Sequence, residues 1–190
     1  MKPDFQRALI PRDEVLQLIG ALNVMKDKLL NAAQQWELLD EYGHVPAAPS
    51  YTALLQHATD AQDLSRDVLR LTADFARSPH HTTRAGSTVL KHLGTAATMS
   101  SHAAPHFTET AECALVLHRS ANSTDRRYLA NRMVIEHASA RAFLRRTSES
   151  LRDAAKELDD HLGFQRFLAT LTRQECPSAP PPPRPGGRHR

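Results

Sequence analysis

The chain has 190 residues, of which 41% are hydrophobic but only 5% aromatic, with 7 glycines. This length can bury a core without disulfides or a structural metal, and the composition favours helices over sheets. The net charge of +3 comes from Arg184, Arg188 and Arg190, so residues 1–176 hold 21 basic and 21 acidic side chains. The pI near 9.1 therefore describes the tail and is no ground for nucleic-acid binding by the rest.

Cysteine usage and hydropathy indicate a soluble cytoplasmic protein. Cys113 and Cys176 are far apart and form no CxxC pair, which is typical of a reducing compartment. Residues 1–20 lack the pattern of a secretion signal, and the longest apolar run, residues 113–117, is too short to span a bilayer. The richness in alanine, arginine, proline and histidine is typical of a high-GC bacterial genome.

The first predicted helix runs from Pro11 to Tyr42. Asp13 and Glu14 favour a helix start, and Gly43 favours an end. Apolar residues alternate at spacings of three and four, which is the a/d seam of a coiled coil. The seam comprises Val15, Leu18, Leu22, Met25, Leu29, Ala32, Trp36 and Leu39.

The second predicted helix covers residues 51–77, after Ser50 as an N-cap and before Ser78. The third covers residues 79–120, and small residues dominate its apolar stripe, so neighbouring helices can approach it closely. Pro105 lies inside it, and we interpret this proline as a kink, with a break into two helices as the alternative. The stripe comprises Val89, Leu93, Ala96, Ser100, Ala103, Phe107, Thr110 or Ala111, and Ala114.

The fourth predicted helix begins at the capping residues 122–124 and ends at His161 or Leu162, because Gly163 follows. A short fifth helix is expected over residues 164–171, where Phe164, Phe167, Leu168 and Leu171 share one face. The apolar stripe of the fourth helix comprises Leu129, Met133, Glu136, Ala140, Phe143 or Leu144, Thr147, Leu151, Ala154, Leu158 and Leu162.

These segments predict an all-α fold, an elongated antiparallel (up-down-up-down) four-helix bundle in one domain, residues 1–176. Residues 177–190 are proline- and arginine-rich without core-forming side chains, and we expect a disordered tail. The third and fourth helices are longer than the first two and should overhang them. The excess must be covered by residues 164–171 and 5–10, or by a second chain.

A candidate metal site consists of His102, His106, Glu109 and Cys113. Spacings of four, three and four put these residues on one helix face, and His-x3-His can bring two imidazoles to one zinc, copper or nickel ion. This face lies opposite the apolar stripe, so we also expect it to be solvent-exposed. His57 could complete a three-histidine set, which would suit a metal-dependent transferase; the simpler interpretation needs no cofactor.

A candidate binding surface for phosphate or an acidic partner consists of Arg127, Arg141, Arg145 and Arg152. These residues lie within about 40° of one another on the fourth helix, opposite its apolar stripe. The alternative is a solvated face that is partly paired with acidic residues of the second helix. No aromatic residues interleave with these arginines and no short helix-turn-helix is visible, which disfavours nucleic acid.

The sequence contains no motif for nucleophilic catalysis or nucleotide binding. The leading hypothesis is a non-enzymatic module for protein-protein interaction, with a second copy of the chain as one candidate partner and no membrane. The alternatives are a metal-binding helical bundle and a nucleic-acid-associated regulator. Whether His57, His102, His106 and His137 converge is the observation that separates these hypotheses best.

Overall fold

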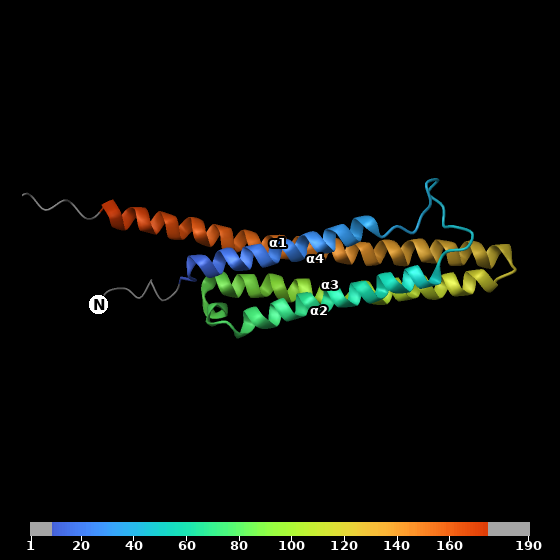
Figure 1. Cartoon of the computed structure of the whole chain (residues 1–190), viewed down its shortest axis with the longest axis horizontal. Coiled ribbons are helices and arrows are strands. Elements are labelled where there is room, and N and C mark those ends of the chain that lie inside the picture. Colours follow the sequence, from blue (N-terminus) through green and yellow to red (C-terminus); the bar gives the residue numbers. More distant parts are fainter. Residues whose placement is uncertain (1–8, 175–190) are drawn as a thin grey trace, which may run out of the picture.

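The computed structural model describes residues 9–174, and the predicted tail over 177–190 lies outside them. The described part is all-α, with no strand (Figure 1). Its helices are α1 (Arg12–Gln35), α2 (Tyr51–Arg77), α3 (Arg84–Arg119) and α4 (Ser123–Gln174), with a 3₁₀ helix over Pro79–Thr82. In this part of the chain, no helix is long and apolar enough to cross a membrane.

The four helices lie along one common direction. In Figure 1, α1 and α3 run from left to right, whereas α2 and α4 run from right to left. The backbones of α3 and α4 lie against each other, α1 packs beside α4, and α2 packs beside α3. The central pair is also the longer pair, as the sequence predicts.

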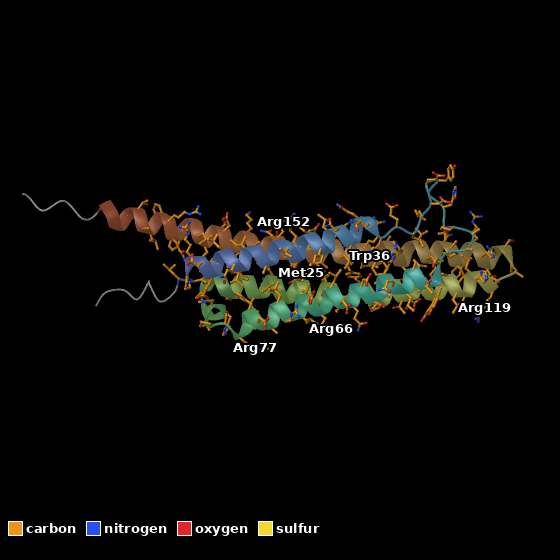
Figure 2. The ribbon with its side chains drawn as sticks, in the orientation of Figure 1. Met25, Trp36, Arg66, Arg77, Arg119 and Arg152 are labelled. Atoms are coloured by element: carbon orange, nitrogen blue, oxygen red, sulfur yellow. The ribbon has the colours of Figure 1, made fainter. Side chains whose placement is uncertain are left out.

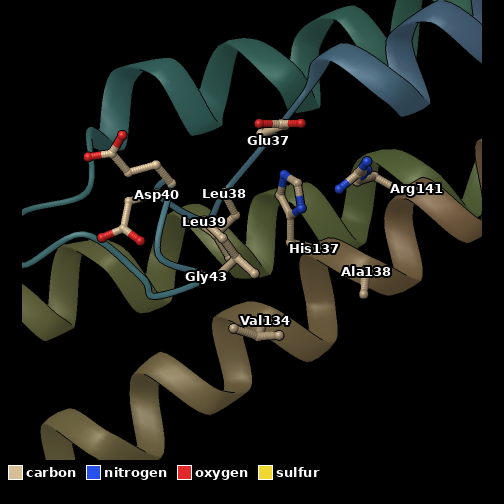
Figure 3. Close-up of a pocket in the computed structure, with 10 residues that line it drawn as sticks. Glu37, Leu38, Leu39, Asp40, Gly43, Val134, His137, Ala138 and Arg141 are labelled. Atoms are coloured by element: carbon tan, nitrogen blue, oxygen red, sulfur yellow. The ribbon is translucent and has the colours of Figure 1, made fainter.

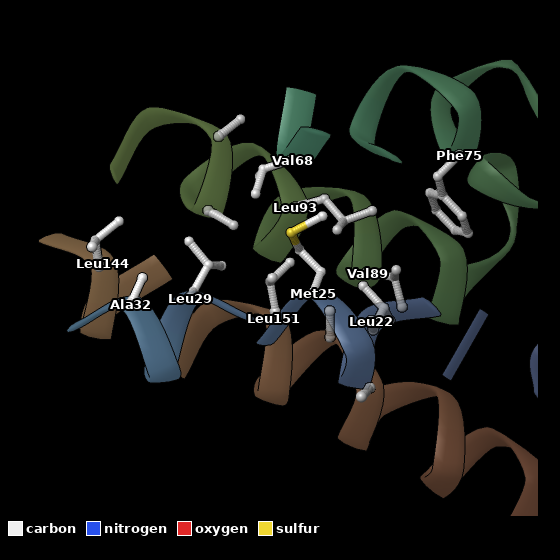
Figure 4. Packing of buried hydrophobic residues seen from close by; sticks show 14 of the residues in the cluster. Leu22, Met25, Leu29, Ala32, Val68, Phe75, Val89, Leu93, Leu144 and Leu151 are labelled. Atoms are coloured by element: carbon white, nitrogen blue, oxygen red, sulfur yellow. The ribbon is translucent and has the colours of Figure 1, made fainter. Parts of the chain in front are cut away.

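The main hydrophobic core runs between the helices and receives residues from all four (Figure 4). Leu22 and Leu29 of α1, Val68 of α2, Leu93 of α3 and Leu151 of α4 are buried in it. The predicted small-residue stripe of α3 is buried throughout, which lets α2 approach closely. At that contact Ser65 and Ser100 hydrogen-bond through their hydroxyls at 3.1 Å.

The predicted bounds of α2 are confirmed. Ser50 accepts a hydrogen bond from the Ala53 amide at 3.3 Å, as an N-cap should. The predicted start of α3 at Pro79 is wrong, because the 3₁₀ turn precedes it and Thr83 caps it by accepting from the Gly86 amide. Gly86 packs so closely on this turn that a Cβ atom would lie 1.9 Å from the His80 carbonyl oxygen.

The predicted end of the first helix at Tyr42 is wrong, since α1 ends at Gln35 and Trp36 is extended. The carbonyl of Ala33 accepts a 2.6 Å hydrogen bond from Arg141 Nε of α4, which satisfies one of the terminal carbonyls. Leu39, predicted in the seam, is 40% exposed as a result.

Pro105 does not divide the third helix. α3 continues through it from Arg84 to Arg119, so the alternative of two separate helices is wrong. Extensive packing against α2 and α4 outweighs the loss of one internal hydrogen bond at proline.

The predicted separate fifth helix is also wrong, because α4 passes through Gly163 without interruption and ends at Gln174. Gly163 does not adopt a positive φ. A glycine inside a helix costs only about 1 kcal/mol relative to alanine, which is too little to end a long helix by itself.

A second, smaller core lies where α3 ends and α4 begins. It comprises Leu38, Leu54, Ala111, Cys113, Ala114, Leu117 and Met133, with Val45 and Leu129 packed against it. Leu38 and Val45 belong to the connecting segment 36–50. This segment therefore covers the part of α3 and α4 that α1 does not reach, and it is held by a turn in which Gly43 has a φ of 78°.

Candidate functional site

Four ring side chains form a layer that crosses the interior between the helices. Trp36 follows α1, His57 comes from α2, Phe107 from α3 and His137 from α4. Trp36 stacks on His57 with centroids 5.0 Å apart and planes 7° apart. The centroids of His57 and His137 are 6.2 Å apart, and Phe107 meets His137 edge-on at 5.3 Å. Two of the four histidines singled out from the sequence therefore converge.

Both imidazoles in this layer carry a buried nitrogen without a hydrogen-bond partner in the described part of the chain, Nδ1 of His57 and Nε2 of His137. Burial, together with the smaller effects of the Arg141 and His57 charges, lowers the pKa of His137 to about 4. Burial also lowers the pKa of His57, although Asp60 opposes this. Both rings are therefore neutral at physiological pH.

An open cleft of about 370 Å³ adjoins the ring layer, between α4 and the segment that follows α1 (Figure 3). His137 and Arg141 project into it from α4, and Glu37 and Asp40 lie on the opposite wall. The Asp40 carboxylate is already engaged, because it accepts hydrogen bonds from the amides of Tyr42 and His44. The remaining lining residues are Leu38, Leu39, Glu41, Gly43, Val134 and Ala138.

This arrangement gives little support to acid-base or nucleophilic chemistry. His137 is only 3% exposed, and a base with a pKa of about 4 is weak at neutral pH. Burial raises the pKa of the Cys113 thiol, the reverse of what activates a nucleophile. The ring layer is better explained as a polar part of the core.

The structure does not bring His102, His106, Glu109 and Cys113 to one point. His106 Nδ1 pairs with Glu136 Oε2 at 2.6 Å, and Glu109 pairs with Arg132 at 2.5 Å. The ring of His102 lies 5.1 Å from that of Phe143 of α4, and Cys113 is buried in the second core.

The expectation that this whole face is exposed is wrong, because α4 packs on it and only His102 is exposed. Within residues 9–174, no three histidine, cysteine or acidic side chains are grouped so that they could hold a metal ion. The predicted metal site thus gains no support from the geometry.

The arginines predicted as one stripe of α4 are not equivalent. Arg127, Arg145 and Arg152 are exposed, and Figure 2 shows Arg152 at the outer edge of α4. Arg141 is half-buried and bonded to α1, so its predicted solvent-facing position is wrong.

The acidic residues of α2 do not pair with that stripe. They pair within their own helix instead, with Asp63–Arg66 at 2.6 Å and Asp74–Arg77 at 2.8 Å. Figure 2 shows Arg66 and Arg77 on the outer side of α2. The predicted pairing between α2 and the α4 arginines is therefore wrong.

The C-terminal end of α4 carries the other distinctive surface. Phe164, Phe167 and Leu171 are 53%, 56% and 43% exposed. They lie within about 60° of one another around the helix, roughly opposite the buried Leu158 and Leu162. We call these three residues the terminal apolar face. Beside it is a cleft lined in part by Leu9, Ala85, Phe164 and Leu168.

Apolar periodicity placed Trp36 and Phe107 in seams but did not predict that they meet. It placed Glu136 in the buried stripe, whereas His137 is the buried residue and Glu136 bonds to His106. The sequence signal for this ring contact was an aromatic residue within each apolar seam. Such a signal does not fix how far one helix is shifted along another, so it does not predict which residues meet. Comparisons with protein-family models, curated proteins and solved structures find no match.

Proposed function

We propose that this chain is an antiparallel four-helix bundle that acts as a non-enzymatic protein-protein interaction module through the terminal apolar face. The observation that carries the proposal is the exposure of Phe164, Phe167 and Leu171 at the end of a helix. Exposed apolar residues that cluster on one side of a helix are typical anchors for a partner's groove or helix.

The shape of the molecule supports this role. The end of α4 extends past the first residues of α1 and α3 in Figure 1. With a rise of about 1.5 Å per residue, α4 is about 78 Å long and α1 about 36 Å. A helix end that projects in this way can present its outer side without steric interference from its neighbours.

A photo-crosslinking residue at position 167 of the full chain tests the proposal in a native cell extract. The matched control carries the same residue in place of Ile135, which is 63% exposed on the same helix. We expect protein adducts from position 167 that excess wild-type chain suppresses and that Phe167→Asp chain does not. Absent adducts, or identical adducts from both positions, would remove the interaction role.

Nucleic-acid binding is a second candidate because Arg127, Arg145 and Arg152 are exposed and are not neutralised by α2. A groove beside α1 also contains Lys26 with Arg145 and Arg152. Phosphate contacts predict a steep loss of DNA or RNA affinity between about 50 and 200 mM salt. Binding that is absent, or independent of salt, excludes this role.

A further inference from the structure

Although the ring layer is part of the core, two of its buried nitrogens have no hydrogen-bond partner. They are Nδ1 of His57 and Nε2 of His137, and within residues 9–174 they are the only buried side-chain nitrogen or oxygen atoms in this condition. A buried polar atom without a partner is costly, so folded proteins normally pair it with a polar group, a water molecule or an ion. The two atoms belong to neighbouring rings, which indicates that one bound species satisfies both.

We propose that His57 and His137 together bind one Cu(I) ion inside the ring layer, through these two nitrogens. The site lies between α2 and α4 and uses none of the residues of the terminal apolar face. It therefore does not rest on the proposed interaction role.

The spacing of the two rings fits a single ion between them. A metal–nitrogen bond of about 2 Å puts the centre of an imidazole about 3.2 Å from the ion, so two rings on one ion have centres at most about 6.4 Å apart. The centres of His57 and His137 are 6.2 Å apart, which corresponds to an arrangement close to linear. A tetrahedral angle at the ion would bring the centres to about 5.2 Å.

The number of ligands selects the ion. Within residues 9–174, no three histidine, cysteine or acidic side chains are grouped so that they could hold a metal, so this pair has no third ligand of that kind. Protein-bound zinc takes three or four such ligands, and calcium and magnesium need several oxygen atoms. Cu(I) accepts two nitrogen ligands in a line and binds imidazole. A site with two histidines therefore fits Cu(I) better than it fits these divalent ions.

A monovalent ion also suits the charges around the layer. Burial lowers the pKa of both imidazoles, so they are neutral and a metal ion displaces no proton. Arg141 would repel a cation near His137, whereas Asp60 favours a positive charge at His57, and Glu37 lies across the adjoining cleft (Figure 3). The cost of burying an ion rises steeply with its charge, so one positive charge is less costly here than two.

The other two rings shield the ion and support its ligands. Trp36 stacks on His57 with planes 7° apart, and the centroid of Phe107 lies 5.9 Å from that of His57 and 5.3 Å from that of His137. A metal-bound imidazole carries part of the positive charge of the ion, so its stacking on an indole includes a cation–π attraction. The open cleft that His137 lines gives an ion a path to the layer.

A titration of the full chain with Cu(I), in competition with a colorimetric Cu(I) chelator and without oxygen, measures the affinity. All chains carry Cys176→Ser, because exposed thiols also bind Cu(I). We expect one equivalent to bind and to quench the fluorescence of Trp36, the single tryptophan, and we expect Zn(II) neither to quench it nor to compete. A chain that binds no Cu(I), or binds it without a change in this fluorescence, overturns the inference.

Two substitutions remove one ligand each and keep an apolar side chain in the layer, His57→Phe and His137→Leu. Each should weaken Cu(I) binding by more than about 100-fold and abolish the quenching. The matched control, His102→Gln with His118→Gln, removes two exposed histidines of α3 and should bind as the parent chain does. Circular dichroism checks that each chain is folded. Equal affinity of the control and the two ligand variants contradicts the site.

X-ray absorption of the Cu(I)-loaded chain identifies the ligands with the layer intact, so this result does not depend on the folding of a variant. We expect two nitrogen ligands and a spectrum typical of two-coordinate Cu(I). Sulfur ligands would place the ion at Cys113 and overturn the inference. Phe167→Asp, which removes the proposed partner contact, should leave Cu(I) binding unchanged, so the interaction role and the metal site fail separately.

Discussion

The rest of the chain covers the N-terminal end of α4 but leaves its C-terminal end largely exposed. At the N-terminal end, Leu38 and Val45 from the segment between α1 and α2 cover Met133 and Leu129. At the C-terminal end, Phe164, Phe167 and Leu171 are left about half exposed. Both ends overhang the shorter helices, yet only one overhang belongs to a core.

This difference shows that an apolar stripe on a helix does not by itself mean burial within the same chain. The covered end is reached by a connecting segment with apolar residues, whereas the other end lies beyond the first turn of α1. From the sequence, we expected either other parts of the chain or a second chain to cover the part of the long helices that extends beyond the short ones. The N-terminal end matches the first possibility, since the connecting segment covers it, whereas Phe164, Phe167 and Leu171 at the other end are exposed.

The largest expected effect comes from Met133→Ala at the covered end. Met133 is fully buried, so its truncation should lower the free energy of unfolding by about 2 to 5 kcal/mol. Phe167→Ala is the matched change at the exposed end and should cost less than about 0.5 kcal/mol. Urea unfolding followed by circular dichroism measures both, and similar losses would mean that the ends do not differ.

Acid should destabilise the ring layer that contains His137, where the covering segment 36–50 begins. The pKa of His137 is about 4 in the folded chain, against 6.5 for an unperturbed histidine, so the unfolded state binds more protons between these values. Stability should therefore fall as the pH drops from about 6.5 to about 4, by about 3 kcal/mol from this group. Above pH 6.5 this histidine contributes no pH dependence.

Unfolding of His137→Leu at about pH 7.5 and about pH 4.5 isolates that contribution, because leucine does not titrate. The variant should lose clearly less stability on acidification than the wild-type chain. The fluorescence of Trp36, the single tryptophan, gives a local signal because its ring stacks on His57. An unchanged loss on acidification in the variant would show that His137 does not carry the effect.

A smaller effect on stability is expected from Asp40→Ala, which weakens the turn within segment 36–50 that covers the N-terminal end of α4. The Asp40 carboxylate accepts hydrogen bonds from the amides of Tyr42 at 3.0 Å and His44 at 2.9 Å. Their loss from an exposed turn should cost about 1 kcal/mol. Hydrogen exchange should speed up within residues 36–50 and stay unchanged in α2. Glu41→Ala, in the same turn, is the control and should leave exchange unaltered.

The smallest effect is a gain from Gly163→Ala near the exposed end. A Cβ atom there would meet nothing within 4 Å, and alanine favours a helix over glycine by about 1 kcal/mol. Thermal unfolding should shift upward slightly. Gly43→Ala is the contrasting change and should be destabilising, because Gly43 has a positive φ. A loss of stability in Gly163→Ala would contradict a continuous α4.

Local signals in the sequence were sufficient for much of the helix content. The cap at Ser50 and the Ser78–Pro79 pair gave the bounds of α2, and apolar spacing gave the buried stripes of α3 and α4. Glycine as a signal for a helix end gave wrong predictions, because its effect depends on tertiary packing around it. Gly163 did not end α4, and Gly43 was not where α1 ended.

The candidate site was less predictable than the fold. Helical spacing correctly placed His102, His106, Glu109 and Cys113 along one side of α3, but α4 packs on that side. Glu136 and Arg132 then take His106 and Glu109 as partners. Which side chain of one helix meets which side chain of another depends on relative height and rotation, and neither follows from spacing within a single helix.

By itself, the sequence determined that the chain is helical, where α2 begins and ends, and which stripes face a core, because propensity, capping and periodicity are properties of a few neighbouring residues. Tertiary structure decided that α1 ends at Gln35, where Arg141 of α4 bonds to the Ala33 carbonyl and Trp36 turns onto His57. It also decided which end of α4 is covered. These outcomes rest on contacts between residues far apart in the chain, and their energies appear only once the helices are packed.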